Sequence, residues 1–168
     1  MDYQTITPTT GILETAFKDN QEGEFANKIL RGELSAVESY NHVIKKYAED
    51  ESISVLNVLR RIRDEHEYAC VKLRQVVKSE GAIPSEESGP WGGFVAALIR
   101  TASLTGENGA IRLLRTGEEH GLNLYEEALD LKLSQEELNL IREVLIAKQE
   151  SHILALDRLL ERDRKVSH

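Results

Sequence analysis

The sequence has little cysteine, proline and aromatic residue, and each shortage excludes a class of protein. Its 168 residues include one cysteine, three prolines and 5% aromatic residues. A single thiol, Cys70, cannot form an internal disulfide, and this usage is typical of a reducing compartment. The few prolines and aromatic residues argue against an all-β protein. These shortages favour a helical protein of the cytoplasm.

Long apolar runs and an excess of positive charge are also missing. No stretch approaches the roughly 18 consecutive apolar residues that a membrane-spanning helix needs. Residues 1–10 have neither the basic start nor the apolar run of a signal peptide. The formal net charge of −8 argues against nucleic acid as a partner, because phosphate binding requires a basic face. We therefore expect a cytoplasmic protein that binds neither membrane nor nucleic acid.

What the sequence does contain is helical periodicity over four long segments. Hydrophobic residues make up 40% of the chain and charged residues 30%, as in a soluble globular domain. Apolar residues recur at spacings of three and four in residues 21–49, 51–79, 107–131 and 135–162. We expect one domain over residues 21–163, with tails at residues 1–20 and 164–168.

The connections between these segments predict the topology. Ser134 and Glu137 have the spacing of a capping box, which marks a short turn before the last segment. The junction near Asp50 is equally short, so each pair of segments should form an antiparallel hairpin. The connection over residues 81–106 is long, begins rich in Gly, Pro and Ser, and becomes apolar at 94–99. The sequence thus predicts an all-α four-helix bundle, two antiparallel hairpins joined by a long crossover containing a short helix.

Each apolar seam is interrupted near its middle by ionisable or amide residues. Counted from the two short turns, Glu33 and Glu118 lie 17 and 15 residues before, and His66 and Gln149 lie 16 residues after. At about 1.5 Å per helical residue, each lies roughly 25 Å from its turn. One polar layer should therefore cross the bundle, with a side chain from every helix.

The first and third segments also repeat a pattern. Glu33 precedes Tyr40 by seven positions, and Glu118 precedes Tyr125 by the same spacing. A repeated pair on both seams indicates a site built about a pseudo-twofold axis. The two tyrosines are either hydrogen-bond donors to the site or core aromatic residues with a hydroxyl near the polar layer.

At this point the residues resemble the ferritin-like superfamily, and bacterioferritin in particular. The stretch from Glu33 to Tyr40 is similar to the first-helix motif Glu-x-x-Ala-x-x-x-Tyr, and Glu118, ten residues before Ala128, resembles the third-helix glutamate. Residues 149–160 are similar to the fourth-helix Glu-x-x-His stretch. Residues 88–92 and 117–120 look like a bacterial ferritin-like family of undefined function. The resemblance covers residues 21–162 and implies that the metal ligands are Glu33, His66, Glu118 and His152.

The chain departs from that family at the two bridging carboxylates. In di-iron bundles the Glu of each Glu-x-x-His motif bridges the metals. Here Arg63 precedes His66 by three residues, and Gln149 precedes His152 by three. At an effective dielectric constant of about 20, the charge of Arg63 at 4 Å would repel each ion by roughly 4 kcal/mol. We expect no normal di-iron centre and no normal ferroxidase activity.

Two interpretations of the polar layer remain. In the first, Glu33, His66, Glu118 and His152 bind a single Fe or Zn ion, which suits two carboxylates and two imidazoles. In the second, Arg63 fills the vacated space and pairs with Glu33 and Glu118, because buried carboxylates need a positive partner. Arg63 reaching the bundle edge would instead leave the site open.

The function follows from which interpretation holds. The preferred hypothesis is a ferritin-like protein with a degenerate site that binds at most one metal ion. The rivals are a metal-dependent oxidase or peroxidase-like stress protein, and a non-catalytic structural or partner-binding bundle. A homodimer through residues 91–94 is one alternative for its assembly. Residues 64–65 are interpreted as part of a solvated acidic face, and Cys70 as a core residue or soft ligand.

Overall fold

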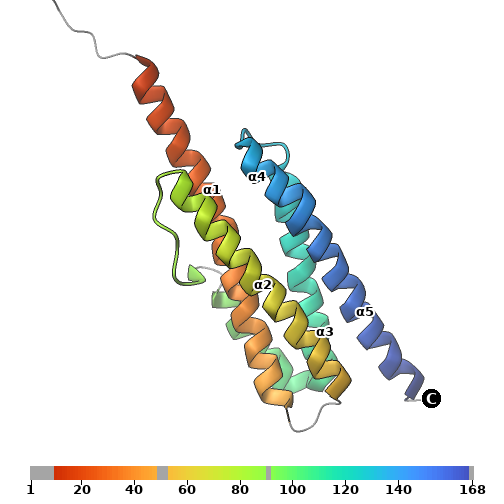
Figure 1. Ribbon diagram of the computed structural model, residues 1–168. Coiled ribbons are helices and arrows are strands. Elements are labelled where there is room, and N and C mark those ends of the chain that lie inside the picture. The colour runs from red at the N-terminus through yellow and green to blue at the C-terminus, as the bar shows by residue number, and fades with distance from the viewer. Residues whose placement is uncertain (1–9, 49–52, 90–91, 167–168) are drawn as a thin grey trace, which may run out of the picture.

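The computed structural model describes the backbone of residues 10–48, 53–89 and 92–166, with side chains at 24–46, 48, 53–89 and 108–162. All regular secondary structure in these ranges is helical, which confirms the predicted all-α class. The elements are α1 (Thr10–Tyr47), α2 (Ile53–Ser79), α3 (Gly92–Ala128), α4 (Gln135–Asn139), the π-helical η2 (Leu140–Ile146) and α5 (Ala147–Val166). Because α4, η2 and α5 follow without a break, the chain forms four long helical segments (Figure 1).

The four segments pack as two hairpins. α1 packs mainly against α2, and α3 packs mainly against α5. Contacts between α1 and α3 join the hairpins, whereas α2 and α5 approach each other least. In Figure 1, α2 lies beside α1 along most of its length, and α4 and α5 form the opposite edge of the bundle. No helix in the described part of the chain is long and apolar enough to span a membrane.

Three helix boundaries differ from the sequence prediction. α1 begins at Thr10, so part of the predicted tail over residues 1–20 is helical. α3 begins at Gly92, so the short helix predicted within the crossover is continuous with the third long helix. α5 reaches Val166, inside the second predicted tail. In each case the added residues contain no proline, and nothing in their composition stops a helix that has already begun.

The turn before α4 has the predicted capping box. The hydroxyl of Ser134 accepts a hydrogen bond from the backbone N–H of Glu137 at 3.2 Å, and the carboxylate of Glu137 accepts one from the backbone N–H of Ser134 at 2.8 Å. The pair satisfies two backbone donors that the start of a helix would otherwise leave unpaired. The predicted turn near Asp50 lies outside the described residues.

The crossover runs along α1. Asn27 donates to the carbonyl of Ile83 and accepts from the backbone N–H of Ser85, both at 2.8 Å. Farther along, the hydroxyl of Ser88 donates to Glu38 at 3.0 Å. Gly81 has a positive φ of 76°, which lets the chain turn directly after α2. Trp91 and the side chain of Phe94, which the dimer alternative invokes, lie outside the described residues.

The core consists of apolar layers on both sides of a polar one. One cluster contains Tyr40, Val43, Ile44, Leu59, Ile62, Ala110, Ile111, Leu114, Leu156 and Leu159. The other contains Ile29, Leu30, Ala69, Cys70, Leu73, Leu124, Tyr125, Ala128, Ile141 and Leu145. Most predicted seam positions are buried as expected. Arg63 is the clear exception, with a side chain that is 27% exposed.

Candidate metal centre

Four ionisable side chains meet in one buried layer, one from each long helical segment. Glu33 of α1 is 2% exposed, His66 of α2 is 3%, Glu118 of α3 is 2% and His152 of α5 is 1%. The residues that the sequence placed at a common level therefore lie together between the two apolar clusters. Burial at this depth requires that every charge have a partner within the layer.

His66 lies between two carboxylates. Its Nδ1 atom is 2.8 Å from Oε2 of Glu33, and its Nε2 atom is 3.1 Å from Oε1 of Glu118. Hydrogen bonds at both positions require a hydrogen on each ring nitrogen, so this geometry suits the imidazolium form. A single side chain thus links the two hairpins electrostatically.

His152 has the same arrangement, with a different outer partner. Its Nδ1 atom is 3.2 Å from Oε2 of Glu118, and its Nε2 atom is 2.7 Å from Oε2 of Glu65. Glu65 also forms an ion pair with Lys148 at 3.2 Å. The assignment of Glu65 to a solvated acidic face is wrong, because its side chain is only 24% exposed and bonds across the bundle from α2 to α5.

Three of the four layer residues converge on one point. One ligand atom from each of His66, Glu118 and His152 lies within 4.8 Å of the others, and all three residues are buried. Glu33, predicted as a fourth ligand, is not in this group and lies on the far side of the His66 ring. Glu33 and Glu65 therefore each stand behind an imidazole that faces Glu118. A carboxylate behind a histidine is the usual support for a metal-bound imidazole, since it fixes the ring and its tautomer.

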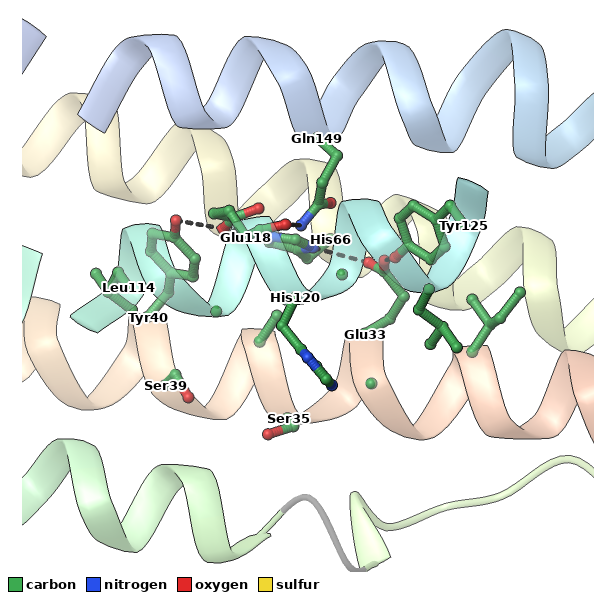
Figure 2. A pocket seen from close by; sticks show the side chains of 16 residues that line it. Glu33, Ser35, Ser39, Tyr40, His66, Leu114, Glu118, His120, Tyr125 and Gln149 are labelled. Carbon is green, nitrogen blue, oxygen red and sulfur yellow. Dashed lines mark hydrogen bonds and ion pairs between the residues drawn. The ribbon is translucent and has the colours of Figure 1, made fainter. Parts of the chain in front are cut away.

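The two tyrosines of the repeated pattern contact the glutamates reciprocally. The hydroxyl of Tyr40 on α1 donates to Oε1 of Glu118 on α3 at 2.5 Å. The hydroxyl of Tyr125 on α3 donates to Oε1 of Glu33 on α1. Figure 2 shows the tyrosines at opposite ends of a row that contains Glu118, His66 and Glu33. Each helix thus supplies the donor for the other helix's carboxylate, as a pseudo-twofold arrangement requires.

The close carboxylates and imidazoles shift each other's pKa. Burial alone would lower the pKa of His66, but the carboxylates of Glu118 and Glu33 outweigh burial and raise it to about 10. Burial alone would raise the pKa of Glu118, but His66 and His152 lower it to about 2. Burial and the neighbouring Glu118 raise the pKa of Tyr40 well above its ordinary value. Glu118 is therefore an ionised carboxylate at neutral pH.

Arg63 does not enter the layer. Its Nε and Nη2 atoms donate to Oδ1 of Asp64 at 2.9 and 2.5 Å, and its Nη1 atom donates to Oδ1 of Asn41 at 3.2 Å. The interpretation in which Arg63 pairs with Glu33 and Glu118 is therefore wrong for this structure. The guanidinium reaches water at the edge between α1 and α2, where both of its partners are exposed.

Gln149 is buried beside the layer without facing the convergent ligand atoms. Its Nε2 atom donates to the backbone carbonyl of Glu118 at 3.0 Å, which joins α5 to α3. Gly121 leaves room for this amide, because a Cβ atom at that position would lie 2.6 Å from Nε2 of Gln149. Cys70 is buried one turn beyond His66 and is outside the convergent group. Burial, the largest cause, raises the pKa of its thiol to about 12, which suits a core residue.

Two cavities reach the layer from opposite sides. One, of about 70 Å³, lies between α1 and α3 and is shown in Figure 2. Glycines and other small residues line it beside Glu33, Glu118 and His66. The other, of about 470 Å³, lies between α2 and α5 and has His66 and His152 in its wall. The convergent imidazoles are therefore buried by neighbouring side chains yet adjacent to open space.

Comparison of the chain with protein-family models, with curated proteins and with solved structures found no match. Its chemistry is accordingly argued from its own residues.

Proposed function

We propose that this protein binds one divalent transition-metal ion through His66, Glu118 and His152, inside a helical bundle of the ferritin-like type, and that it lacks normal ferroxidase activity. The observation that carries the proposal is the convergence of two imidazoles and one carboxylate, all buried, within 4.8 Å. Two imidazoles with a carboxylate are a donor set found at catalytic zinc and at non-haem ferrous iron.

The charges of the layer fit a divalent ion. Glu33 and Glu118 bring two negative charges into the interior, and a single divalent cation would offset both. In the metal-free protein, hydrogen bonds from His66 to both carboxylates serve that purpose. A metal ion would take the place of the proton on Nε2 of His66, while Nδ1 would keep its hydrogen bond to Glu33. Binding should therefore leave the outer contacts unchanged.

One ion suits the site better than two. A di-iron centre depends on carboxylates that bridge the metals, and the chain has none at the positions of Arg63 and Gln149. Arg63 points outward to Asp64, and Gln149 donates to a backbone carbonyl. Glu118 is the single carboxylate in the convergent group.

The course of the chain supports the ferritin-like topology. Ala82, directly after α2, packs beside Ala26 near one end of the bundle. Ala110 and Ile111 of α3 pack with Ile44, near the opposite end of α1. The connection after α2 therefore returns the chain along the bundle before the second hairpin, as the single long crossover of ferritin-like folds does.

Three protein ligands leave coordination positions at which a bound ion would hold water or a small molecule. The protein's own part is to orient the ligands. Glu33 and Glu65 fix the two imidazole rings, and Tyr40 fixes the carboxylate of Glu118. The surrounding apolar clusters limit how far water enters.

Metal content and affinity test this proposal. Protein purified without chelator or nickel resin should contain close to one zinc or iron per chain, measured by elemental analysis. Calorimetric titration of the metal-free protein with Zn²⁺ should give one site, and the variant His152→Gln should bind at least 100-fold more weakly. The matched control is His42→Gln, since His42 is only partly buried and lies outside the convergent group.

The outcomes distinguish the candidate functions. Equal Zn²⁺ affinity in both histidine variants, or no uptake by a fully folded protein, would refute the metal site and leave a structural bundle. Rapid oxygen consumption on adding Fe²⁺ would instead identify an oxidase. We expect no consumption faster than that of a Glu118→Gln variant.

A further inference from the structure

The larger cavity has features that the metal proposal does not use. It holds about 470 Å³ between α2 and α5, the pair of helices that approach each other least. Its wall includes His66 and His152, so any occupant would lie against the rings of the candidate metal ligands. A single metal ion with its water needs far less space, and a cavity of this size is in the range of small-molecule sites, roughly 300–1,000 Å³.

The cavity is polar at one end and apolar at the other. Asn57, Arg60 and Arg61 line it near the start of α2. At the far end its walls are Tyr68, Ala69, Val144 and Leu145. Arg61 and Ala69 are eight residues apart on one helix, which corresponds to roughly 12 Å. The space therefore suits an elongated molecule with one polar and one apolar end.

The charges at the polar end do not cancel. Asp64 is engaged by Arg63 at 2.5 Å, and Glu65 by His152 and Lys148 at 2.7 and 3.2 Å.

Arg60 and Arg61 have no ion-pair partner among the residues that the structure describes. Two uncompensated guanidinium groups beside a cavity contrast with the net charge of −8 of the whole chain. The end of the cavity near Arg60 and Arg61 therefore favours an anion.

We propose that this cavity binds a small amphiphilic anion. Its carboxylate or other oxyanion head contacts Arg60 and Arg61, and its apolar chain lies along Ala69, Val144 and Leu145. Guanidinium groups pair with carboxylate and phosphate through two parallel hydrogen bonds, which explains the choice of head group. The body of the ligand crosses His66 and His152 and so places a C–H-rich chain beside the candidate metal centre. Binding itself depends on the cavity, and the metal-free protein is expected to bind as well.

Calorimetric titration with decanoate, dodecyl phosphate and the neutral analogue decanol tests the proposal on metal-free and zinc-loaded protein. We expect decanoate and dodecyl phosphate to bind the metal-free protein, and decanol to bind at least tenfold more weakly. The double variant Arg60→Gln/Arg61→Gln should weaken decanoate binding at least tenfold. Arg158→Gln, an exposed arginine on α5 away from this cavity, is the matched control and should leave binding unchanged.

A second variant tests the apolar end. Val144→Trp should fill the cavity and abolish decanoate binding, while circular dichroism confirms that the variant remains helical. Decanol binding as tight as decanoate, or decanoate affinity unchanged in the double arginine variant, would overturn the proposal. Binding confined to zinc-loaded protein and insensitive to Arg60 and Arg61 would also overturn it, since the metal would then hold the head group. Failure of zinc binding alone leaves this inference standing, because its first readout uses metal-free protein.

Discussion

The histidine between two carboxylates shows how strongly a buried environment controls one proton. Desolvation disfavours a charged imidazole, and a lone buried histidine is usually neutral for this reason. His66 instead has a carboxylate at each ring nitrogen, and attraction to Glu118 and Glu33 exceeds the cost of burial. The charge of His66 therefore contributes to folding for as long as the proton is held.

This residue predicts how stability depends on pH in the metal-free protein. The pKa of His66 rises from 6.5 to about 10 on folding, so its contribution is complete below pH 6.5 and is lost as the pH rises toward 10. The pKa of Glu118 falls from 4.5 to about 2, so its contribution is present above pH 4.5 and is lost as the pH falls toward 2. Urea unfolding should show greatest stability between these limits, from pH 4.5 to 6.5, as far as this pair determines it.

The variant His66→Gln is the control for that prediction. It should be less stable than the wild type at pH 6 and should lose the decline between pH 6.5 and 10, the interval bounded by the two pKa values of His66. A wild-type free energy of unfolding that stays constant across this interval would contradict the assignment.

Arg63 supports a prediction of opposite character, in which a charge reversal does little. Its guanidinium contacts Asp64 and Asn41 at the bundle edge, where solvent screens its charge. Replacing it in Arg63→Glu should change Zn²⁺ affinity by no more than about twofold to threefold, since exposed ion pairs contribute only about 0–1 kcal/mol. Glu118→Gln, measured in the same titration, should abolish binding. A tenfold gain of affinity in Arg63→Glu would show that the arginine does oppose the metal.

At the scale of the elements, α1 and α3 each contain a glycine with a different role. A Cβ atom at Gly32 would meet nothing within 4 Å, whereas one at Gly121 would meet the amide of Gln149. The first glycine leaves open space beside the smaller cavity, and the second lets α5 approach α3. Both lie inside helices, where glycine is unfavourable relative to alanine.

Matched alanine substitutions distinguish these two roles. Gly32→Ala should raise the free energy of unfolding by about 0.5–1 kcal/mol, through helix propensity alone. Gly121→Ala gains the same propensity but displaces the Gln149 amide from the carbonyl of Glu118, a hydrogen bond worth about 1 kcal/mol, so its net gain should vanish. Urea denaturation of both variants at pH 7 measures the difference. Equal stabilisation by both substitutions would show that the contact between Gly121 and Gln149 is unimportant.

The π-helical segment η2 is also decided at the scale of elements. It lies between α4 and α5 and carries Val144 and Leu145, which line the larger cavity. An inserted π turn shifts the faces of the helix that follows, and such segments often occur at functional sites. The helical periodicity of residues 135–162 predicted a helix here without indicating that its hydrogen-bond pattern changes.

For the molecule as a whole, the candidate metal centre joins the two hairpins. His66 belongs to the first hairpin, and Glu118 and His152 belong to the second. A metal ion that holds all three can bind only the assembled bundle. Binding to the folded state alone stabilises it by mass action.

Zinc should therefore raise the melting temperature in a concentration-dependent way. At free Zn²⁺ of about 100 times the dissociation constant, the expected stabilisation of about 2.7 kcal/mol corresponds to roughly 5–10 °C for a protein of this size. Differential scanning calorimetry measures the shift, and Mg²⁺, which prefers oxygen ligands, should give none. An equal shift in the His152→Gln variant would place the bound ion elsewhere.

The amino-acid sequence alone determined the helical class, the four seams and the level at which Glu33, His66, Glu118 and His152 meet. These features follow from spacing along one helix, which each segment encodes locally. The sequence also indicated the exchange of Tyr40 and Tyr125 between helices, through a repeat that both seams carry.

Only the tertiary structure decided which way residues at the edges of the seams turn. Arg63 and Glu65 flank the same helix face, yet the first points to solvent and the second bonds His152. Periodicity cannot separate them, because the choice depends on which neighbouring helix offers an opposite charge or a hydrogen bond. The cavity between α2 and α5 is likewise set by how far apart two packed helices lie, which no single segment encodes.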